Sequence, residues 1–140
     1  QPRGWVTTAL GPIALAQEVV EQVRPLQEAV QEAVGEPIFV TGFAPGWYLL
    51  AGRPNPTPFD IVHAGLGTTG SDAALVQRRL AAQPPQAIIM PAWQWRPGDG
   101  PPRSDALAVQ QGLAAWWAAL PQTYREIPLP TVSRWVLLVR

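Results

Sequence analysis

The sequence predicts a single α/β domain. We expect a three-layer sandwich with a mainly parallel sheet of about five strands and an antiparallel C-terminal hairpin strand. Short apolar runs alternate along the chain with longer segments of helical periodicity, which is typical of strands joined by helices. Proline and glycine are spread through the connections and do not form one linker. A chain of 140 residues that is 47% hydrophobic suits one core, with residues 1–18 as an N-terminal connector and residues 19–140 as the core.

The first expected element is a helix over residues 19–34, because its apolar side chains recur at spacings of three and four. This stripe consists of Val19, Val23, Leu26, Val30 and Val34. Gly35 is a typical helix end. Pro25 lacks an amide donor, so it predicts either a kink or a second helix that begins there.

Three short segments predict strands of a parallel sheet. Residues 38–40 and 87–90 are apolar runs typical of buried strands, and residues 60–64 are a poorer candidate, because they contain Asp60 and His63. Helices are expected over residues 45–51 and from Ser71 to about Gln83, where Ser71 and Asp72 supply an N-cap and a first-turn acid. Between them, residues 53–58 hold alternate prolines and predict a stiff loop.

The last third of the sequence predicts a long loop, a helix and two strands. Residues 91–103 are rich in proline and glycine and indicate the loop. Ser104 and Asp105 cap the helix and Pro121 ends it, with a core-facing stripe of Val109, Leu113, Trp116 and Leu120. Residues 123–127 and 134–139 are expected to be antiparallel strands, because a short turn containing proline joins them.

Composition argues against several classes of function. Ten acidic and ten basic residues cancel, so no overall field attracts nucleic acid. The chain has no cysteine and one histidine, His63, which leaves no recognisable metal-ligand spacing and no Ser-His-Asp set. We therefore expect no catalytic residue, metal or cofactor here. No apolar run reaches the roughly 18 residues of a spanning helix, so any membrane anchor is expected outside this sequence.

The sharpest motif is GLGTTG, a G-x-G-x-x-G pattern between an expected strand and an expected helix. Such glycines bring a dinucleotide pyrophosphate close to a helix N-terminus. The acid that would bind the ribose about 20 residues later is missing, so a tight turn is the favoured interpretation. The alternative is phosphate binding by the backbone and hydroxyl groups of Gly65, Gly67, Thr68, Thr69, Gly70 and Ser71.

Tryptophan occurs seven times, and its ring can pack in a core, stack on a sugar or lie at a membrane interface. Expected buried faces favour core packing for Trp47, Trp116 and Trp135. The Pro-rich loop holds Trp93, Trp95, Arg96 and Arg103. These loop residues could contact a glycan, a lipid phosphate or a neighbouring membrane domain, and tryptophans that fold back over the core edge are an equally good interpretation.

Residues 38–57, IFVTGFAPGWYLLAGRPNPT, resemble a stretch in the extracytoplasmic C-terminal domains of GT-C type membrane glycosyltransferases, relatives of the dolichyl-phosphate-mannose and aminoarabinose transferases. The match centres on YLLAGRPNPT, residues 48–57. Its distinctive residues are Tyr48, Gly52, Arg53, Pro54, Asn55, Pro56 and Thr57. Residues 19–140 are also similar to these domains in the order of their expected elements.

The resemblance implies a transferase that takes a sugar from a polyprenyl-phosphate donor, with catalytic carboxylates in a loop between transmembrane helices. This sequence contains no such loop, so no catalytic residue is carried over. The chain would be a soluble accessory domain on the periplasmic or extracellular face, shaping acceptor access or stabilising the enzyme. Its partners would be the transmembrane domain of the same polypeptide and a polyprenyl-phosphate sugar or glycan acceptor.

Within the motif, a structural role is favoured for residues 53–57, because Pro-Asn-Pro-Thr fixes a turn and Arg53 can bind carbonyls. The alternative is that Arg53 holds a phosphate or an acceptor. Two other functions stay open for the whole chain. One is a small nucleotide- or phosphate-binding α/β protein that uses residues 65–71, and the other is a glycan or protein interaction module that uses Trp93 and Trp95.

Overall fold

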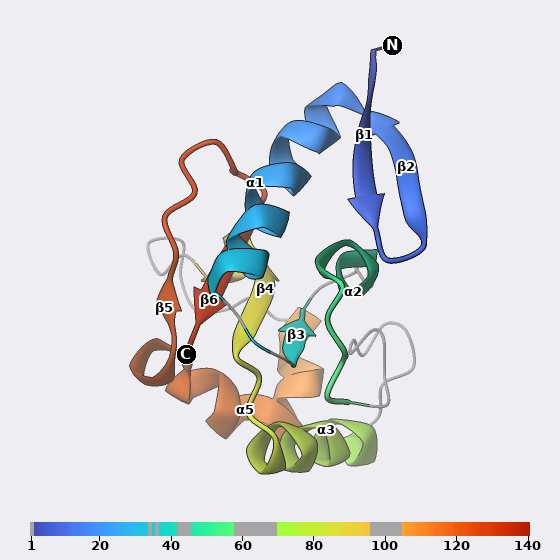
Figure 1. The fold of residues 1–140 in the computed structure, drawn as a ribbon. Coiled ribbons are helices and arrows are strands. Elements are labelled where there is room, and N and C mark those ends of the chain that lie inside the picture. Colours follow the sequence, from blue (N-terminus) through green and yellow to red (C-terminus); the bar gives the residue numbers. More distant parts are fainter. Residues whose placement is uncertain (1, 34, 36, 42–45, 58–69, 96–104) are drawn as a thin grey trace.

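The computed structural model describes residues 2–33, 35, 37–41, 46–57, 70–95 and 105–140, and Figure 1 shows how their elements are arranged. In chain order these are β1 (Arg3–Thr8), β2 (Gly11–Ala16), α1 (Gln17–Ala33), β3 (Ile38–Val40), α2 (Gly46–Ala51), α3 (Gly70–Ala82), β4 (Ala87–Pro91), α4 (Ala92–Trp95), α5 (Asp105–Thr123), β5 (Arg125–Glu126) and β6 (Trp135–Val139). Among the described residues, no helix is both long and apolar enough to cross a membrane.

The central sheet has four described strands in the order β3-β4-β6-β5. β3 and β4 are parallel, whereas β6 runs antiparallel to both of its neighbours. The antiparallel hairpin is confirmed, but the mainly parallel five-stranded sheet is wrong for the described residues, and the strand expected at residues 60–64 lies outside them. The antiparallel strand β6 lies inside the sheet, beside β4, because its residues 136–139 are all buried. A strand that is apolar on both faces is stable in such a position.

Helices cover both faces of this sheet, as expected for an α/β sandwich. One face packs with α1, α2 and the β1–β2 hairpin through the strand residues Ile38, Val40, Ala87, Ile89, Leu137 and Val139. The opposite face packs with α3 and α5 through Phe39, Ile88, Met90, Val136 and Leu138. In Figure 1, α3 and α5 lie together on one side of the sheet, and α1 lies on the other.

α1 is one helix with Pro25 inside it. Of the two outcomes predicted for Pro25, the second helix does not occur. Proline cannot donate to the carbonyl of Glu21, but Glu21 is exposed, so water can hydrate that carbonyl. Leu26 and Val30 are fully buried on the same stripe as Val23, which holds the helix on one core on both sides of the proline.

The N-terminal segment forms a β-hairpin where the sequence predicts only a connector. β1 and β2 pair antiparallel, and Gly11 at the turn has a φ of 110°, which favours glycine. The Thr8 hydroxyl accepts from the Leu10 amide at 3.1 Å and donates to the Gly11 carbonyl at 2.7 Å. Val6 is buried against the core that contains α1. The hairpin is therefore part of the packed domain.

Several boundaries differ from those predicted. α3 begins at Gly70, so Ser71 lies inside its first turn and not at its N-cap. Residues 92–95 form α4, where a loop is expected. α5 continues beyond Pro121 to Thr123, and the Tyr124 amide donates to the Leu120 carbonyl at 2.8 Å, which closes the last turn. β5 is consequently shorter than the strand predicted over residues 123–127.

Candidate functional site

The motif that carries the resemblance lies along the outer edge of β3. The amide of Val40 donates to the Tyr48 hydroxyl at 3.0 Å, and the amide of Ile38 donates to the Pro54 carbonyl at 3.3 Å. The amide of Thr41 instead donates across the parallel pair to the Ile89 carbonyl at 3.0 Å. Alternate residues of a strand point their amides to opposite sides, so the motif occupies the side of β3 that has no strand partner among the described residues.

The same segment is tied to α1 at the end of α2. Gln27 donates its side-chain amide to the Leu50 carbonyl at 2.7 Å, and Gln31 donates to the Ala51 carbonyl at 3.0 Å. These two amides satisfy carbonyls that a helix end leaves without intrahelical partners. Gly52 follows with a φ of 64°, the left-handed conformation that ends many helices and suits glycine.

The remaining motif residues form a turn beside this helix end. Arg53 is half-buried, and its Nη2 lies 3.4 Å from Oε1 of Gln31. Oδ1 of Asn55 accepts from the amide of Thr57 at 2.9 Å and from its hydroxyl at 3.0 Å, and Thr57 is buried. The contacts of Asn55 and Thr57 stabilise this turn. Both the structural role of residues 53–57 and the binding of a phosphate or acceptor by Arg53 stay predictions.

The carboxyl ends of the parallel strands β3 and β4 carry a second group of polar and aromatic residues. Ligands of α/β proteins often bind at such ends. Here the buried Thr41 hydroxyl donates to Oε1 of Gln94 at 2.8 Å. Trp93 is 46% exposed, whereas Trp95 packs partly buried against the core on the α5 side. The two tryptophans therefore do not form one exposed pair, and their predicted neighbours Arg96 and Arg103 lie outside the described residues.

The glycine-rich motif is described only at its end. Gly65, Gly67, Thr68 and Thr69 lie outside the described residues, as does His63. Gly70 and Ser71 are the first residues of α3, and Ser71 is exposed. Phosphate binding by this segment stays a prediction. Among the described residues no group of histidines and carboxylates could hold a metal.

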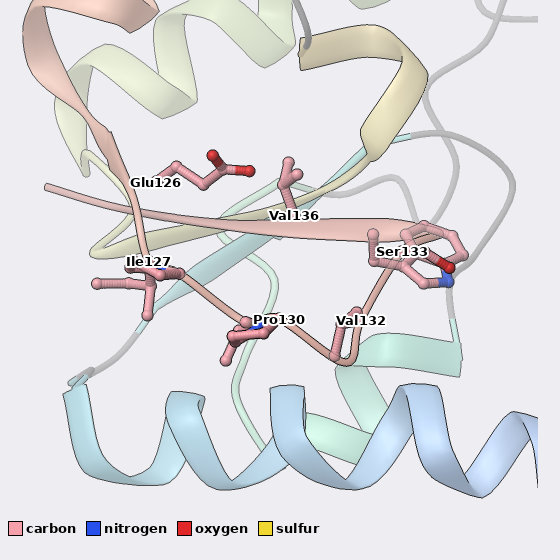
Figure 2. Close-up of a pocket in the computed structure, with 9 residues that line it drawn as sticks. Glu126, Ile127, Pro130, Val132, Ser133 and Val136 are labelled. Atoms are coloured by element: carbon pink, nitrogen blue, oxygen red, sulfur yellow. The ribbon is translucent and has the colours of Figure 1, made fainter.

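Sequence reasoning missed a cavity of about 370 Å³ between β6 and the connection from β5 to β6, shown in Figure 2. Glu126 and Val136 lie on one side of the β6 ribbon, and Pro130 and Val132 lie on the other. The described residues that line it are Glu126, Ile127, Pro128, Leu129, Pro130, Val132, Ser133, Trp135 and Val136. The available signal was the pair of prolines between two strands, since neither can donate to a sheet ladder.

Gln22 of α1 fixes the wall of this cavity. Its Oε1 accepts from the amides of Ser133 at 2.9 Å and Arg134 at 3.1 Å, and its Nε2 donates to the Thr131 carbonyl at 3.1 Å. Val132, between these contacts, is 5% exposed and belongs to the core of the α1 face. The connection is therefore anchored to α1 and held away from β6.

Tyr124 is the one described group whose titration is clearly perturbed. Burial raises the pKa of its phenol, and the positive charge of Arg140 partly offsets the rise. Its hydroxyl donates to the Pro85 carbonyl at 2.7 Å inside the protein. This hydrogen bond ties Tyr124, the residue before β5, to the segment that precedes β4.

No family model, curated protein or solved structure matches the chain. The resemblance therefore rests on residues 48–57 and on the order of the elements.

Proposed function

We propose that this chain is a noncatalytic domain of a membrane-bound glycosyltransferase that uses a polyprenyl-phosphate sugar. In this proposal it lies at the extracytoplasmic face, where it stabilises the enzyme or shapes access of the acceptor. The observation that carries the proposal is the place of the motif: Tyr48 and Pro54 accept the β3 amides that point away from β4, and the helix end between them is bound by α1.

The contacts of the motif support a domain shared with these glycosyltransferases more strongly than a reaction shared with them. Residues that close a sheet edge and end a helix are needed wherever the same domain is built, whatever reaction its protein performs. Tyr48 supplies an acceptor to a buried amide, and Gly52 supplies a left-handed residue. Catalytic chemistry is accordingly proposed to reside in the transmembrane part of the same polypeptide.

The first test concerns membrane attachment. We expect the full open reading frame that encodes this chain to give a protein that stays in the membrane pellet after an alkaline carbonate wash. Residues 1–140 expressed alone should be released by the same wash and serve as the control. Full-length protein found in the supernatant would contradict the proposal. If the protein is retained, its membranes should transfer a radiolabelled sugar from a polyprenyl-phosphate donor.

The second test separates support from participation in the reaction. Arg53→Gln should reduce the amount of folded full-length enzyme while leaving turnover per folded molecule within about twofold, because a structural contact acts through stability. Arg78→Gln is the matched control, since Arg78 is exposed on α3. A tenfold lower turnover with an unchanged amount of folded enzyme would place Arg53 in substrate binding and refute the noncatalytic role.

The exposure of Trp93 favours a second candidate, a glycan or protein interaction module. An indole that is 46% exposed beside the carboxyl end of β4 can stack on a sugar ring or anchor a partner. Trp93→Ala should then abolish binding on a glycan array or to a partner without lowering the melting temperature. Trp5→Ala, which removes another exposed indole from β1, is the control. Equal binding by the wild type, Trp93→Ala and Trp5→Ala would exclude this candidate.

A further inference from the structure

The ladder between β5 and β6 ends before the two segments separate. Arg125 pairs with Val139 and Glu126 with Leu138, and the Ile127 amide donates to the Leu137 carbonyl at 2.9 Å. The next rung of this register would place Leu129 opposite Trp135. The Leu129 carbonyl instead accepts from the amide of Val132 at 3.0 Å, within the connection. The position of the missing rung is where the cavity lies.

The backbone of Trp135 faces this cavity. On the β4 side, the Arg134 carbonyl accepts from the Ala92 amide at 3.0 Å. Since neighbouring residues of an antiparallel strand direct their backbone groups to opposite sides, Trp135 directs its N–H and C=O away from β4, as Leu137 does. Among the described residues, neither of these Trp135 groups has a backbone partner. The N–H and C=O of Trp135 therefore offer a bound chain one hydrogen-bond donor and one acceptor, as a residue of a strand edge does.

The sequence of the connection keeps this rung open. Pro128 and Pro130 flank Leu129, and each lacks an amide and restricts its predecessor to extended geometry. Gln22 and the buried Val132 then hold the connection on α1. The resulting volume of about 370 Å³ falls within the range of ligand pockets, which is roughly 300–1,000 Å³.

We propose that this cavity binds an extended peptide segment whose backbone completes the missing rung at Trp135. Strand addition of this kind uses main-chain hydrogen bonds for affinity and alternate side chains for specificity. Among the described lining residues Glu126 is the one with an ionisable side chain. It pairs with Leu138 and therefore projects to the α5 face, so it favours a lysine or arginine next to the peptide residue that pairs with Trp135. Ile127 and Val132 lie on the α1 face and offer apolar contacts to the side chain of the residue that pairs with Trp135.

The test uses the blocked tripeptide acetyl-Lys-Val-Lys-amide, titrated into ¹⁵N-labelled protein and followed by NMR. Its central valine pairs with Trp135, and its flanking lysines project to the face of Glu126. We expect saturable shifts of the Trp135 amide signal and slower hydrogen exchange of that amide once it is paired. The same tripeptide with an N-methyl group on its valine amide lacks a donor and should bind at least fivefold more weakly. N-acetylglucosamine is titrated separately, because its acetamido group offers the same donor and acceptor from a sugar.

Glu126→Gln tests the charge preference. This variant should bind acetyl-Lys-Val-Lys-amide about fivefold more weakly, the upper end for an exposed ion pair, and bind acetyl-Gln-Val-Gln-amide with unchanged affinity. Glu18→Gln is the matched control, since Glu18 is exposed on α1 away from the lining.

Two results would overturn the proposal. One is the absence of saturable change at Trp135 with any peptide, and the other is saturation by N-acetylglucosamine where the peptides fail. Equal binding of the lysine tripeptide to the wild type and to Glu126→Gln would overturn the assigned basic preference. The membrane proposal is independent of these outcomes, because it rests on residues 48–57 and the carbonate wash.

Discussion

Replacing Tyr48 by phenylalanine removes one hydroxyl from the motif and leaves its ring in place. That hydroxyl accepts the amide of Val40 at 3.0 Å on the outer edge of β3. Val40 is 2% exposed, so water has little access to the orphaned amide after the change. If the motif covers this edge as described, Tyr48→Phe should destabilise the domain even though no apolar contact is lost.

The expected size follows from the chemistry of a buried donor. Leaving such a group without a partner costs about 1–3 kcal/mol, because its desolvation is no longer compensated. A chain of 140 residues has an unfolding entropy on the order of 300 cal/mol/K near its melting temperature. A loss of about 2 kcal/mol therefore lowers the melting temperature by about 7 °C.

Calorimetry and amide exchange measure this effect directly. Tyr124→Phe is the matched control, since the Tyr124 hydroxyl donates to the Pro85 carbonyl at 2.7 Å and its loss orphans an acceptor. Acceptors tolerate incomplete pairing better than donors, so the control should lower the melting temperature less. A shift below about 1 °C for Tyr48→Phe, with unchanged exchange of the Val40 amide, would refute the edge-covering role.

Three further outcomes are expected. Gly4→Ala should lower stability by about 1–3 kcal/mol in chemical denaturation, because its new methyl group would lie 2.8 Å from Oε1 of Gln17 and 2.9 Å from Cγ2 of Val20; wild-type stability would contradict this close approach. Gln22→Ala should accelerate exchange of the Ser133 amide by at least tenfold and leave the core protected, and unchanged exchange would show that other contacts hold the connection. Burial raises the pKa of Tyr124 above its ordinary value of 10.0, so the unfolded chain releases this proton first and stability should fall as pH rises above about 10; an equal fall in Tyr124→Phe would exclude this cause.

Strong apolar periodicity made most of the helices and central strands predictable. The stripe through Val23, Leu26 and Val30 predicts α1, and the apolar runs at residues 38–40 and 87–90 predict the parallel pair. The position of β6 was not predictable from its own residues. A buried strand can pair with any apolar neighbour, and only packing of the whole sheet decides that it lies between β4 and β5.

The N-terminal hairpin gave a weak signal for a physical reason. Its two central turn residues are Ala9 and Leu10, which lack the Asn-Gly or Asp-Gly pattern of common two-residue hairpin turns. Trp5 is 63% exposed while Thr8 is buried, so polarity does not alternate in the usual sense along β1. Contacts distant in sequence compensate, since Arg24 and Gln27 of α1 donate to carbonyls of β1 at 2.8 and 2.7 Å.

The candidate sites also differ in how far the sequence predicts them. The Tyr48–Thr57 motif was identified by its resemblance to a family, and its alternate prolines predicted a stiff loop from residue 53 onward. The cavity beside β6 exists because Leu129 does not pair with Trp135. The register between the two segments decides this, and it cannot be predicted from the sequence. The sequence predicts a shared role for Trp93 and Trp95. In the short helix α4, however, Trp93 is exposed and Trp95 is partly buried.

Among the described residues, β3 and the start of β6 both have backbone groups beyond the strand ladder, and they differ in how these groups are covered. Proteins usually cover or shorten free strand edges, because unpaired backbone groups recruit other chains. At β3, Tyr48 and Pro54 accept the outward amides of Val40 and Ile38. At the start of β6, beyond its pairing with β5, Gln22 holds the connection on α1, which leaves the Trp135 rung open in a cavity that also contains a carboxylate. Since the chain covers the outward amides of β3 with its own contacts, an occupant explains the open Trp135 rung better than a lack of means to close it.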